Sequence, residues 1–442
     1  YKVVLYNLGT DSSRGERLHG ILEKLGIPAE EIKDENRNET VGYLAGLKGY
    51  EAAGKTYEGK GSQTEFMLLC NLPESLLDRF LAEMTAENLR INHKAVVTEY
   101  NREAEFHELI DEIGGEHDVF QALLDLDAMI RQAEKLTKDQ NGKSPAWSDF
   151  EKALTAAKKV LSSEEPGLSD LQKATAELKK QYLEVTGMKE IQGSIAIDIE
   201  QDASGTYTVK ASTLGADGAK TDAAGYDFLW NDGTTGDTLK NISADKLITY
   251  TVTVTAKDKF GSLKAGLQVP DKPQAEATVS KGGVKLTWKA PKAEQNKPLP
   301  TSYKAVVYDK DGKAVTEATC DGTTTSLQLD VNTSQTYTIK FWAISPVGRS
   351  DMQTLTTAAY DSAKDPAQPS DPAKNNGGQK GDPAKNNANA SGAAKADASA
   401  ARTGNADTAK TGDESQAGLL AALALLAVAG AGAALHRRRK EL

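Results

Sequence analysis

The sequence has little of the cysteine, histidine and basic charge on which several classes of protein depend. Its two cysteines, Cys70 and Cys320, are too few and too far apart in the chain to form a disulfide framework or a CxxC metal site, and there are only five histidines. The 63 acidic residues outnumber the 53 basic ones, whereas phosphate binding needs a concentrated basic face. We therefore exclude a disulfide scaffold, a zinc protein and a nucleic-acid-binding protein.

The supply of aromatic residues is also small and uneven. Aromatic residues make up 6% of the 442 residues, and Tyr360 is the last of them. Apolar residues make up 39%, which is thin for one large core but adequate for several small ones. At about 150 residues per domain, this length predicts two to four domains. The composition thus favours a chain of small modules.

Residues 1–118 alternate between strand-like and helix-like patterns. Apolar runs of strand length at 2–8, 66–72 and 94–97 are each followed by apolar residues at helical spacing. This order predicts a small α/β domain in which helices cover a sheet. The blocks YKVVLYNL, VGYLAG, EFMLLCNL, HKAVVTEYN and ELIDEIGGEH resemble a small family of unknown function known from clostridial bacteria. That resemblance implies no particular reaction.

Residues 119–188 contain three stretches with apolar residues on one helical face, separated by short polar breaks. Three amphipathic helices joined by short loops predict a three-helix bundle. Trp147, the AAKKVL stretch and the closing ATAELKK resemble the FIVAR module. That module is a helical bundle repeated in Gram-positive surface proteins and extracellular glycosidases.

From residue 189 the pattern changes, and apolar and polar residues alternate with the period of two that is typical of strands. This pattern continues through two regions, 189–270 and 271–360, with Gly, Asp and Asn turns between the strands. Each region therefore predicts a β-sandwich. The run WNDGTTGDTL followed by YTVTVTAKDKFGS makes the first similar to a PKD or bacterial immunoglobulin-like domain. Trp288, Tyr303, Tyr337 and a closing GRS make the second resemble fibronectin type III. This resemblance implies that Tyr337 ties the corner of the sandwich together.

The C-terminal part of the chain predicts a tether and an anchor. Residues 361–416 are mainly Ala, Asn, Asp, Gly, Lys, Pro and Ser, so we expect a disordered linker that spans roughly 40 Å. Residues 417–435 are 19 uncharged apolar or small residues, enough to cross a hydrocarbon core of about 30 Å as a helix. The basic cluster 437–440 then predicts a cytoplasmic tail, so that 417–442 form a transmembrane helix and its basic end.

A degenerate sorting signal precedes the apolar run. Thr408, Ala409, Lys410, Thr411 and Gly412 form TAKTG, which resembles the LPxTG signal of sortases with Thr and Ala in place of Leu and Pro. The resemblance implies cleavage between Thr411 and Gly412 and attachment of Thr411 to peptidoglycan. The alternative is a plain transmembrane anchor with an incidental Thr–Gly pair.

No set of residues has the pattern of a catalytic, cofactor or metal site. His93, His107 and His117 lie in the N-terminal segment, but no ligand pair has the i, i+3 or i+4 spacing of a helical metal site. We expect Gly114–Gly115 to interrupt the helix between the last two histidines. The prediction is therefore surface histidines, a buried structural Cys70, and no catalytic residue, cofactor or metal.

Two other features of the sequence bear on ligand binding. Segment 49–61 is rich in glycine but lacks the spacing of a phosphate-binding loop. Trp342 alternates out of phase with Phe341, and neighbours on a strand point to opposite faces, so one of the pair leaves the core. We expect Trp342 to face solvent, where it would offer a lone aromatic platform to a sugar.

These features predict a non-catalytic, multi-domain protein of a Gram-positive cell envelope, anchored to the membrane or wall. We expect it to act as a spacer, as an adhesin or in the display of a glycan-binding surface. The resemblances imply sortase, peptidoglycan and glycans or host-surface ligands as its partners. Two alternatives stay open. The chain is either the accessory C-terminal region of an exported glycoside hydrolase whose catalytic domain is absent, or a cytoplasmic protein defined by 1–118, because no signal peptide precedes Lys2.

Overall fold

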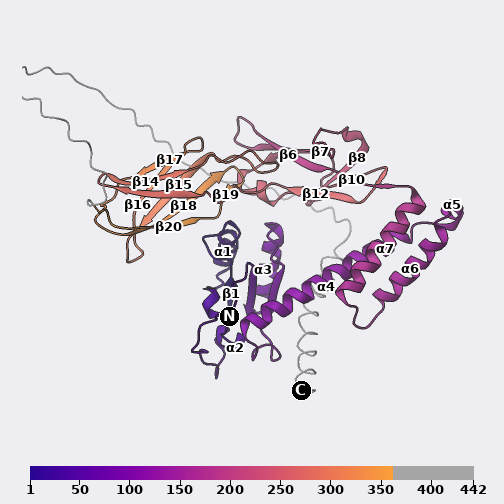
Figure 1. Cartoon of the computed structure of the whole chain (residues 1–442), viewed down its shortest axis with the longest axis horizontal. Coiled ribbons are helices and arrows are strands. Elements are labelled where there is room, and N and C mark those ends of the chain that lie inside the picture. Colours follow the sequence, from indigo (N-terminus) through magenta and orange to yellow (C-terminus); the bar gives the residue numbers. More distant parts are fainter. Residues whose placement is uncertain (362–442) are drawn as a thin grey trace, which may run out of the picture. The chain divides into compact units, whose positions relative to one another are not determined.

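The computed structural model describes residues 1–361. Along the chain, Figure 1 shows a small α/β region, a helical region and two regions built of strands. Each region encloses its own apolar core. The described part is therefore multi-domain, as the composition predicts.

The N-terminal region is a four-stranded mixed sheet with helices on both faces. The strands lie in the order β2-β1-β3-β4, with β1 parallel to β2 and antiparallel to β3, and with β3 parallel to β4. The strands are β1 (Lys2–Tyr6), β2 (Ala29–Ile32), β3 (Phe66–Cys70) and β4 (His93–Val96). The helices are α1 (Ser13–Leu25), η1 (Asp34–Asn36), α2 (Val41–Leu44), α3 (Glu74–Ala86) and the first half of α4 (Phe106–Ala133).

Side chains that alternate along β1 supply the two cores of this region. Val3 and Leu5 pack with α1 and α3, whereas Val4 and Tyr6 pack with α2 and α4. This follows from the pleat of a strand, which sends successive side chains to opposite faces. Because both faces are covered, the two central strands, β1 and β3, are apolar along almost their whole length, as the sequence pattern indicates.

Helix α1 begins and ends where its sequence predicts. The Ser12 side chain accepts a hydrogen bond from the Gly15 backbone N–H at 2.9 Å, which caps the first turn. Gly26 ends the helix in the left-handed conformation, with φ of 66°. Glycine reaches that conformation without a steric penalty, so its place after the last turn stops the helix.

Helix α4 runs unbroken for 28 residues through Gly114 and Gly115, so the predicted interruption is wrong. Its first half, up to Ile113, packs in the sheet core, and its second half, from Ala122, packs in the bundle core. Tertiary packing at both ends outweighs the low helix propensity of glycine in the middle. The predicted boundary between 1–118 and 119–188 therefore falls inside a helix.

The second half of α4 packs with two further helices as a three-helix bundle. These are α6 (Trp147–Leu161) and α7 (Leu168–Thr186), and a single turn, α5 (Lys138–Asn141), lies in the connection. The core residues come from all three helices at helical spacing: Leu126, Met129, Ile130, Trp147, Phe150, Ala157, Leu171, Leu178 and Tyr182. The predicted bundle is confirmed by this core.

Two three-stranded sheets enclose the core of the first sandwich, and a short two-stranded sheet is separate from both. The first sheet has the order β6-β7-β9, the second β12-β10-β8, and β5 pairs with β11. The strands are β5 (Lys189–Glu190), β6 (Ser194–Gln201), β7 (Tyr207–Leu214), β8 (Tyr226–Trp230), β9 (Thr238–Ile242), β10 (Thr251–Ala256), β11 (Lys259–Phe260) and β12 (Ser262–Gly266), with 3-10 turns η2 (Ala223–Gly225) and η3 (Ala244–Thr249). Trp230 is 1% exposed in this core and donates its Nε1–H to the Gly236 carbonyl at 2.9 Å.

The second sandwich packs a three-stranded sheet against a five-stranded one. The orders are β13-β14-β17 and β16-β15-β18-β19, with β20 also paired to β18. The strands are β13 (Ala275–Ser280), β14 (Gly283–Trp288), β15 (Ser302–Tyr308), β16 (Ala314–Asp321), β17 (Ser326–Leu329), β18 (Tyr337–Ser345), β19 (Gly348–Arg349) and β20 (Gln353–Thr357). Trp288, Tyr303 and Phe341 form the aromatic centre of the core.

Membrane anchoring is predicted from a part of the chain that the structure does not describe. The apolar run 417–435 and its basic tail lie outside residues 1–361. Among residues 1–361, no helix has both the length and the apolar character needed to span a bilayer.

Candidate functional site

The three histidines that the sequence singled out make two separate contacts, one of His107 with Glu105 and one of His93 with His117. His107 Nε2 is 2.8 Å from a carboxylate oxygen of Glu105, and this hydrogen bond holds the pKa of Glu105 below its usual value. The rings of His93 and His117 meet edge to face, with centroids 5.2 Å apart. Among residues 1–361, no three His, Cys, Asp or Glu side chains converge as metal ligands would.

Cys70 lies on β3 in the sheet core, away from solvent, with 0% exposure. Burial raises the pKa of its thiol to about 11. A thiol of this kind holds almost no thiolate at neutral pH and is a poor nucleophile. Its place fits the predicted structural role.

Arg37 forms a buried polar cluster that the sequence analysis missed. Its side chain is 3% exposed, and its guanidinium carbon lies 4.4 Å from the centre of the Tyr57 ring and 5.6 Å from that of Tyr6. Nη1 lies 3.5 Å from Asp34 Oδ1, to which the Tyr6 hydroxyl also donates. Within the described residues, Arg37 Nε is buried without a hydrogen-bond partner. Burial and the bond to Asp34 raise the pKa of Tyr6.

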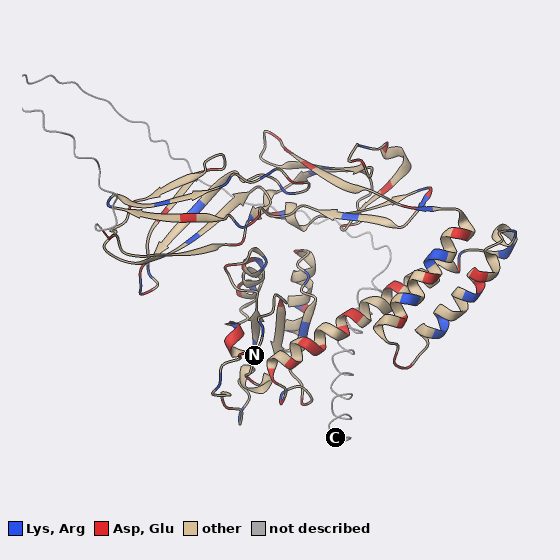
Figure 2. Cartoon of the chain, in the orientation of Figure 1, with Lys and Arg blue, Asp and Glu red and all other residues tan. Residues whose placement is uncertain are grey.

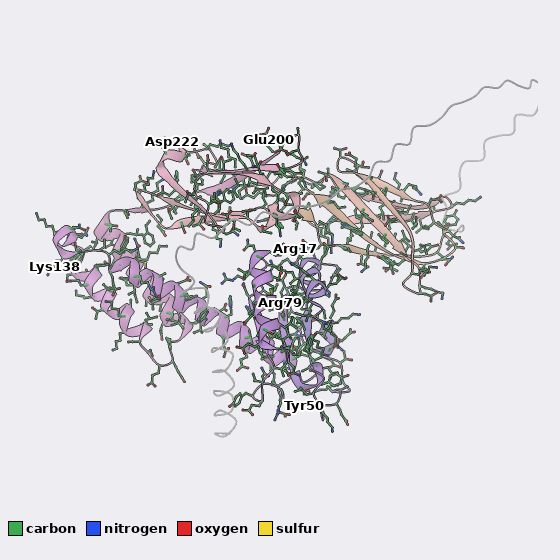
Figure 3. The ribbon with its side chains drawn as sticks, turned by 180° about the vertical axis from the view of Figure 1, so that it is seen from behind. Arg17, Tyr50, Arg79, Lys138, Glu200 and Asp222 are labelled. Atoms are coloured by element: carbon green, nitrogen blue, oxygen red, sulfur yellow. The ribbon has the colours of Figure 1, made fainter. Side chains whose placement is uncertain are left out.

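Residues 45–65, which we call the strap, cover this cluster and connect α2 to β3 without a helix or strand. Arg37 Nη1 donates to the Lys60 carbonyl of the strap at 2.9 Å, and the Tyr57 N–H donates to the Glu35 carbonyl at 3.1 Å. At the other end of the strap, the Tyr50 hydroxyl donates to Glu103; Tyr50 is labelled in Figure 3. Connections this long within a domain are uncommon. The cluster therefore fastens a long irregular segment onto the sheet domain.

An open groove of about 880 Å³ lies between α4 and α7. Polar side chains line both walls: Asp118, Gln121 and Asp125 from α4, and Gln172, Lys180 and Glu184 from α7. Acidic residues are frequent along α4, as Figure 2 shows. The walls thus offer carboxylate acceptors together with amide and ammonium donors, a set suited to ligands with several hydroxyl or amide groups. We regard this groove as the candidate binding site.

The outer face of the five-stranded sheet carries Trp342. Phe341 is 0% exposed in the core, while Trp342 is partly exposed on the opposite face, so the predicted alternation is confirmed. Trp342 stands opposite Lys304 in the register of β18 and β15. On the same face, Lys340 Nζ lies 5.9 Å from the centre of the Tyr308 ring. The other tryptophans, Trp147, Trp230 and Trp288, are buried.

The corner of the second sandwich decides its class. The Tyr337 hydroxyl donates to the Asn332 carbonyl at 2.8 Å, which ties the start of β18 to the chain just before it. Its backbone N–H donates to Thr357 Oγ1 at 3.0 Å. This is the tyrosine corner that the resemblance implied. The second sandwich is fibronectin type III-like.

Solved fibronectin type III structures are similar to this chain at low identity. A two-domain fibronectin type III segment of chicken tenascin is 14% identical, covering 37% of this chain and 97% of its own, with a TM-score of 0.22. The fn3 domain of human collagen alpha-1(XX) is 17% identical, covering 24% of this chain and 96% of its own, with a TM-score of 0.19. At these TM-scores the likeness adds nothing to the strand order and the corner of the chain itself.

Residues 65–120 match a family described as a domain of unknown function, DUF3783. The matched segment runs from β3 through the first half of α4. A domain of unknown function in the N-terminal region is thereby confirmed, over a shorter range than the predicted 1–118. No curated protein matches the chain. The predicted sorting residues, Thr408 to Gly412, lie outside the described residues.

Proposed function

We propose that this chain is a non-catalytic modular protein of a Gram-positive cell envelope, whose folded domains present a ligand-binding surface and whose C-terminal segment attaches it. The observation that carries the proposal is the order of three elements: TAKTG at 408–412, the apolar run 417–435 and the basic residues 437–440. This order resembles that of a sortase sorting signal, in which a short motif precedes an apolar run and a basic tail. A membrane-spanning run followed by a basic cluster also retains the chain in the bilayer without a sortase.

The folded domains suit spacing and display. A fibronectin type III-like sandwich fits a non-catalytic modular protein, and each described region has its own core. The bundle resembles the FIVAR module of Gram-positive surface proteins and extracellular glycosidases, and the first sandwich resembles a PKD or bacterial immunoglobulin-like domain. Residues 361–416 then act as the tether between the last sandwich and the anchor.

The ligand in this proposal is a glycan or another hydroxyl-rich molecule of a host surface. The groove between α4 and α7 supports this choice, because Gln121 and Gln172 place amides on its two walls beside carboxylates and Lys180. Trp342 adds an aromatic face on the second sandwich, where a sugar ring stacks well.

Fractionation of cells tests the anchoring. The chain is exported behind a known signal peptide in a Gram-positive host that has a sortase. Thr411→Ala with Gly412→Ala is expected to abolish covalent attachment to peptidoglycan and to leave the chain in the membrane fraction. Deleting 417–442 is expected to release it into the medium. The matched control changes the second Thr–Gly pair, Thr403→Ala with Gly404→Ala, and keeps wall attachment.

Two results would contradict parts of this proposal. If the Thr411 and Gly412 double variant is still linked to peptidoglycan, the sorting signal is wrong. If the unaltered chain stays wholly in the membrane fraction, it is anchored by 417–435 alone.

Binding to immobilised glycans tests the ligand. Gln121→Ala with Gln172→Ala is expected to weaken binding in the groove, and Trp342→Ala to weaken binding on the sheet. Lys138→Ala, on the exposed turn α5 labelled in Figure 3, serves as the control and leaves binding unchanged. Absence of glycan binding by the unaltered chain contradicts this part of the proposal.

A further inference from the structure

One short stretch of α4 belongs to neither of the two cores that hold the helix. Ile113 is the last residue of α4 buried in the sheet core, and the next one buried in a core is Ala122, in the bundle. Val119 is partly buried against the bundle. Residues 114–118, which we call the junction turn, therefore contribute no residue to either apolar core, and the ring of His117 against His93 is a contact they make with the sheet domain. Local opening of a helix is easiest where buried contacts are fewest.

The junction turn is also built from poor helix-forming residues. Gly114 and Gly115 follow one another, and glycine is the weakest helix former apart from proline. A methyl group added at either position would meet no other atom within 4 Å. Close packing therefore does not require glycine here. What glycine contributes is backbone freedom.

Three glutamates stand on the same side of this part of α4. Glu108, Glu112 and Glu116 are spaced four residues apart, so their side chains are neighbours on the helix surface. We call them the glutamate ladder. Like charges at this spacing destabilise a helix when they are ionised. Of the three, Glu116 lies in the junction turn itself, so its charge, beside that of Glu112, acts on this turn.

We propose that the junction turn is a pH-dependent hinge, which opens by local unwinding when Glu116 is ionised and closes as Glu116 takes up a proton. The domain with the DUF3783 match and the helical bundle are then joined stiffly in mildly acidic surroundings and loosely at neutral or alkaline pH. This inference does not rest on the proposed envelope function.

The direction of the pH dependence follows from the pKa of Glu116. Burial, and then the neighbouring Glu112, raise that pKa from 4.5 to about 7 in the closed helix. Once the turn unwinds, Glu116 is hydrated and its pKa returns towards 4.5. The closed state thus binds the proton more tightly, and its stability falls as the pH rises through about 7. Burial and Glu108 raise the pKa of Glu112 in the same sense.

Other titratable and charged groups surround the junction turn. They are His117 and Asp118 on α4, Arg90, His93 and Lys94 at the start of β4, and Lys179, Lys180 and Glu184 on α7. Burial, and then His93, lower the pKa of His117, so its protonation opposes the closed state. His117 is therefore protonated only below the ordinary histidine pKa of 6.5. Above pH 6.5 the change in opening can be attributed to Glu116.

Hydrogen exchange of the full chain, followed by mass spectrometry, measures the hinge. The ratio of observed to intrinsic exchange rates gives the opening equilibrium of the junction turn at each pH. Between pH 6.5 and pH 8, opening is expected to increase about twofold to threefold, because Glu116 loses its proton in that range and is half-exposed to solvent. Peptides from α6 serve as the internal reference and keep their protection.

Three variants test the contributions of the glutamates and of the glycines separately. Glu116→Gln is expected to remove the pH dependence, while Glu151→Gln, at an exposed position of α6, keeps it. Gly114→Ala with Gly115→Ala is expected to increase protection at both pH values. The proposal is overturned if the unaltered chain shows equal opening at pH 6.5 and pH 8. It is also overturned if Glu116→Gln retains the dependence.

Discussion

The hydroxyl of Tyr337 donates to the backbone carbonyl of Asn332 across 2.8 Å, five residues upstream. The same tyrosine ring is 5% exposed and packs in the core of the second sandwich. One side chain thus joins the core to the segment between β17 and β18. A buried hydrogen bond of this kind contributes about 1 kcal/mol to stability, and leaving its partner unsatisfied costs more.

Tyr337→Phe is expected to lower the free energy of unfolding of the second sandwich by about 1–2 kcal/mol, because it removes the hydroxyl and keeps the ring. Denaturant unfolding followed by tryptophan fluorescence measures the change. Tyr308→Phe, on the partly exposed outer face of the sheet, is the matched control and should change the midpoint little. An unchanged midpoint for Tyr337→Phe would show that the corner contributes nothing.

The two tryptophans of the second sandwich should differ in their effect on stability. Trp288 is 7% exposed and contacts the Tyr303 and Phe341 rings, so Trp288→Ala is expected to cost about 3–5 kcal/mol. Trp342 lies on the outer face, and Trp342→Ala is expected to cost about 1 kcal/mol. Thermal denaturation of the two variants gives the comparison. Equal losses would mean that Trp342 is part of a core.

Arg37 is expected to hold the strap in place. Arg37→Met keeps much of the side-chain volume but leaves Asp34 and the Lys60 carbonyl without the guanidinium, at a cost of about 1–2 kcal/mol. Trypsin should then cleave the strap at Lys55 and Lys60 faster than in the unaltered chain. Denaturant unfolding gives the stability.

The control for this prediction is another arginine of the same domain. Arg79→Met removes an exposed guanidinium on α3, labelled in Figure 3, and should change neither stability nor cleavage of the strap. Unaltered cleavage of the strap in Arg37→Met would show that other contacts hold it.

The two cysteines should react with iodoacetamide at very different rates. The thiolate is the reactive form, and burial raises the pKa of Cys70 to about 11, so little thiolate is present at pH 8. Cys320 is partly exposed, and burial raises its pKa as well. We expect Cys320 to react slowly and Cys70 only when the domain unfolds. Mass spectrometry after timed labelling measures both, and in denaturant the two rates should become equal.

Much of this fold could be predicted from local patterns of side chains. The apolar spacing of Trp147, Phe150 and Ala157 marks the buried stripe of α6, and the alternation of Phe341 and Trp342 marks the two faces of β18. These patterns are readable because helix and strand geometry repeat every few residues. Tyr337 was predictable for the same reason, since its role depends on its place at the start of a strand.

Short or poorly patterned elements were missed. β2 (Ala29–Ile32) is an edge strand with one buried residue, and α2 (Val41–Leu44) is a single turn, so neither carries a full period of apolar residues. β9 (Thr238–Ile242) likewise contains polar residues between its two buried ones. Such elements are held by the neighbours with which they pair, rather than by propensity.

Long-range contacts account for the rest. The order β2-β1-β3-β4 depends on which strands pair across the sheet, and α4 stays helical through Gly114 and Gly115 because cores at both ends hold it. Arg37 looks like any surface residue in its polar run, yet Tyr6, Tyr57 and Lys60 surround it. The partners of a buried charge lie far away in sequence and meet only on folding, so no periodic pattern in the sequence predicts them. The face that a residue presents is a local property of the chain, whereas what covers that face depends on the whole packed domain.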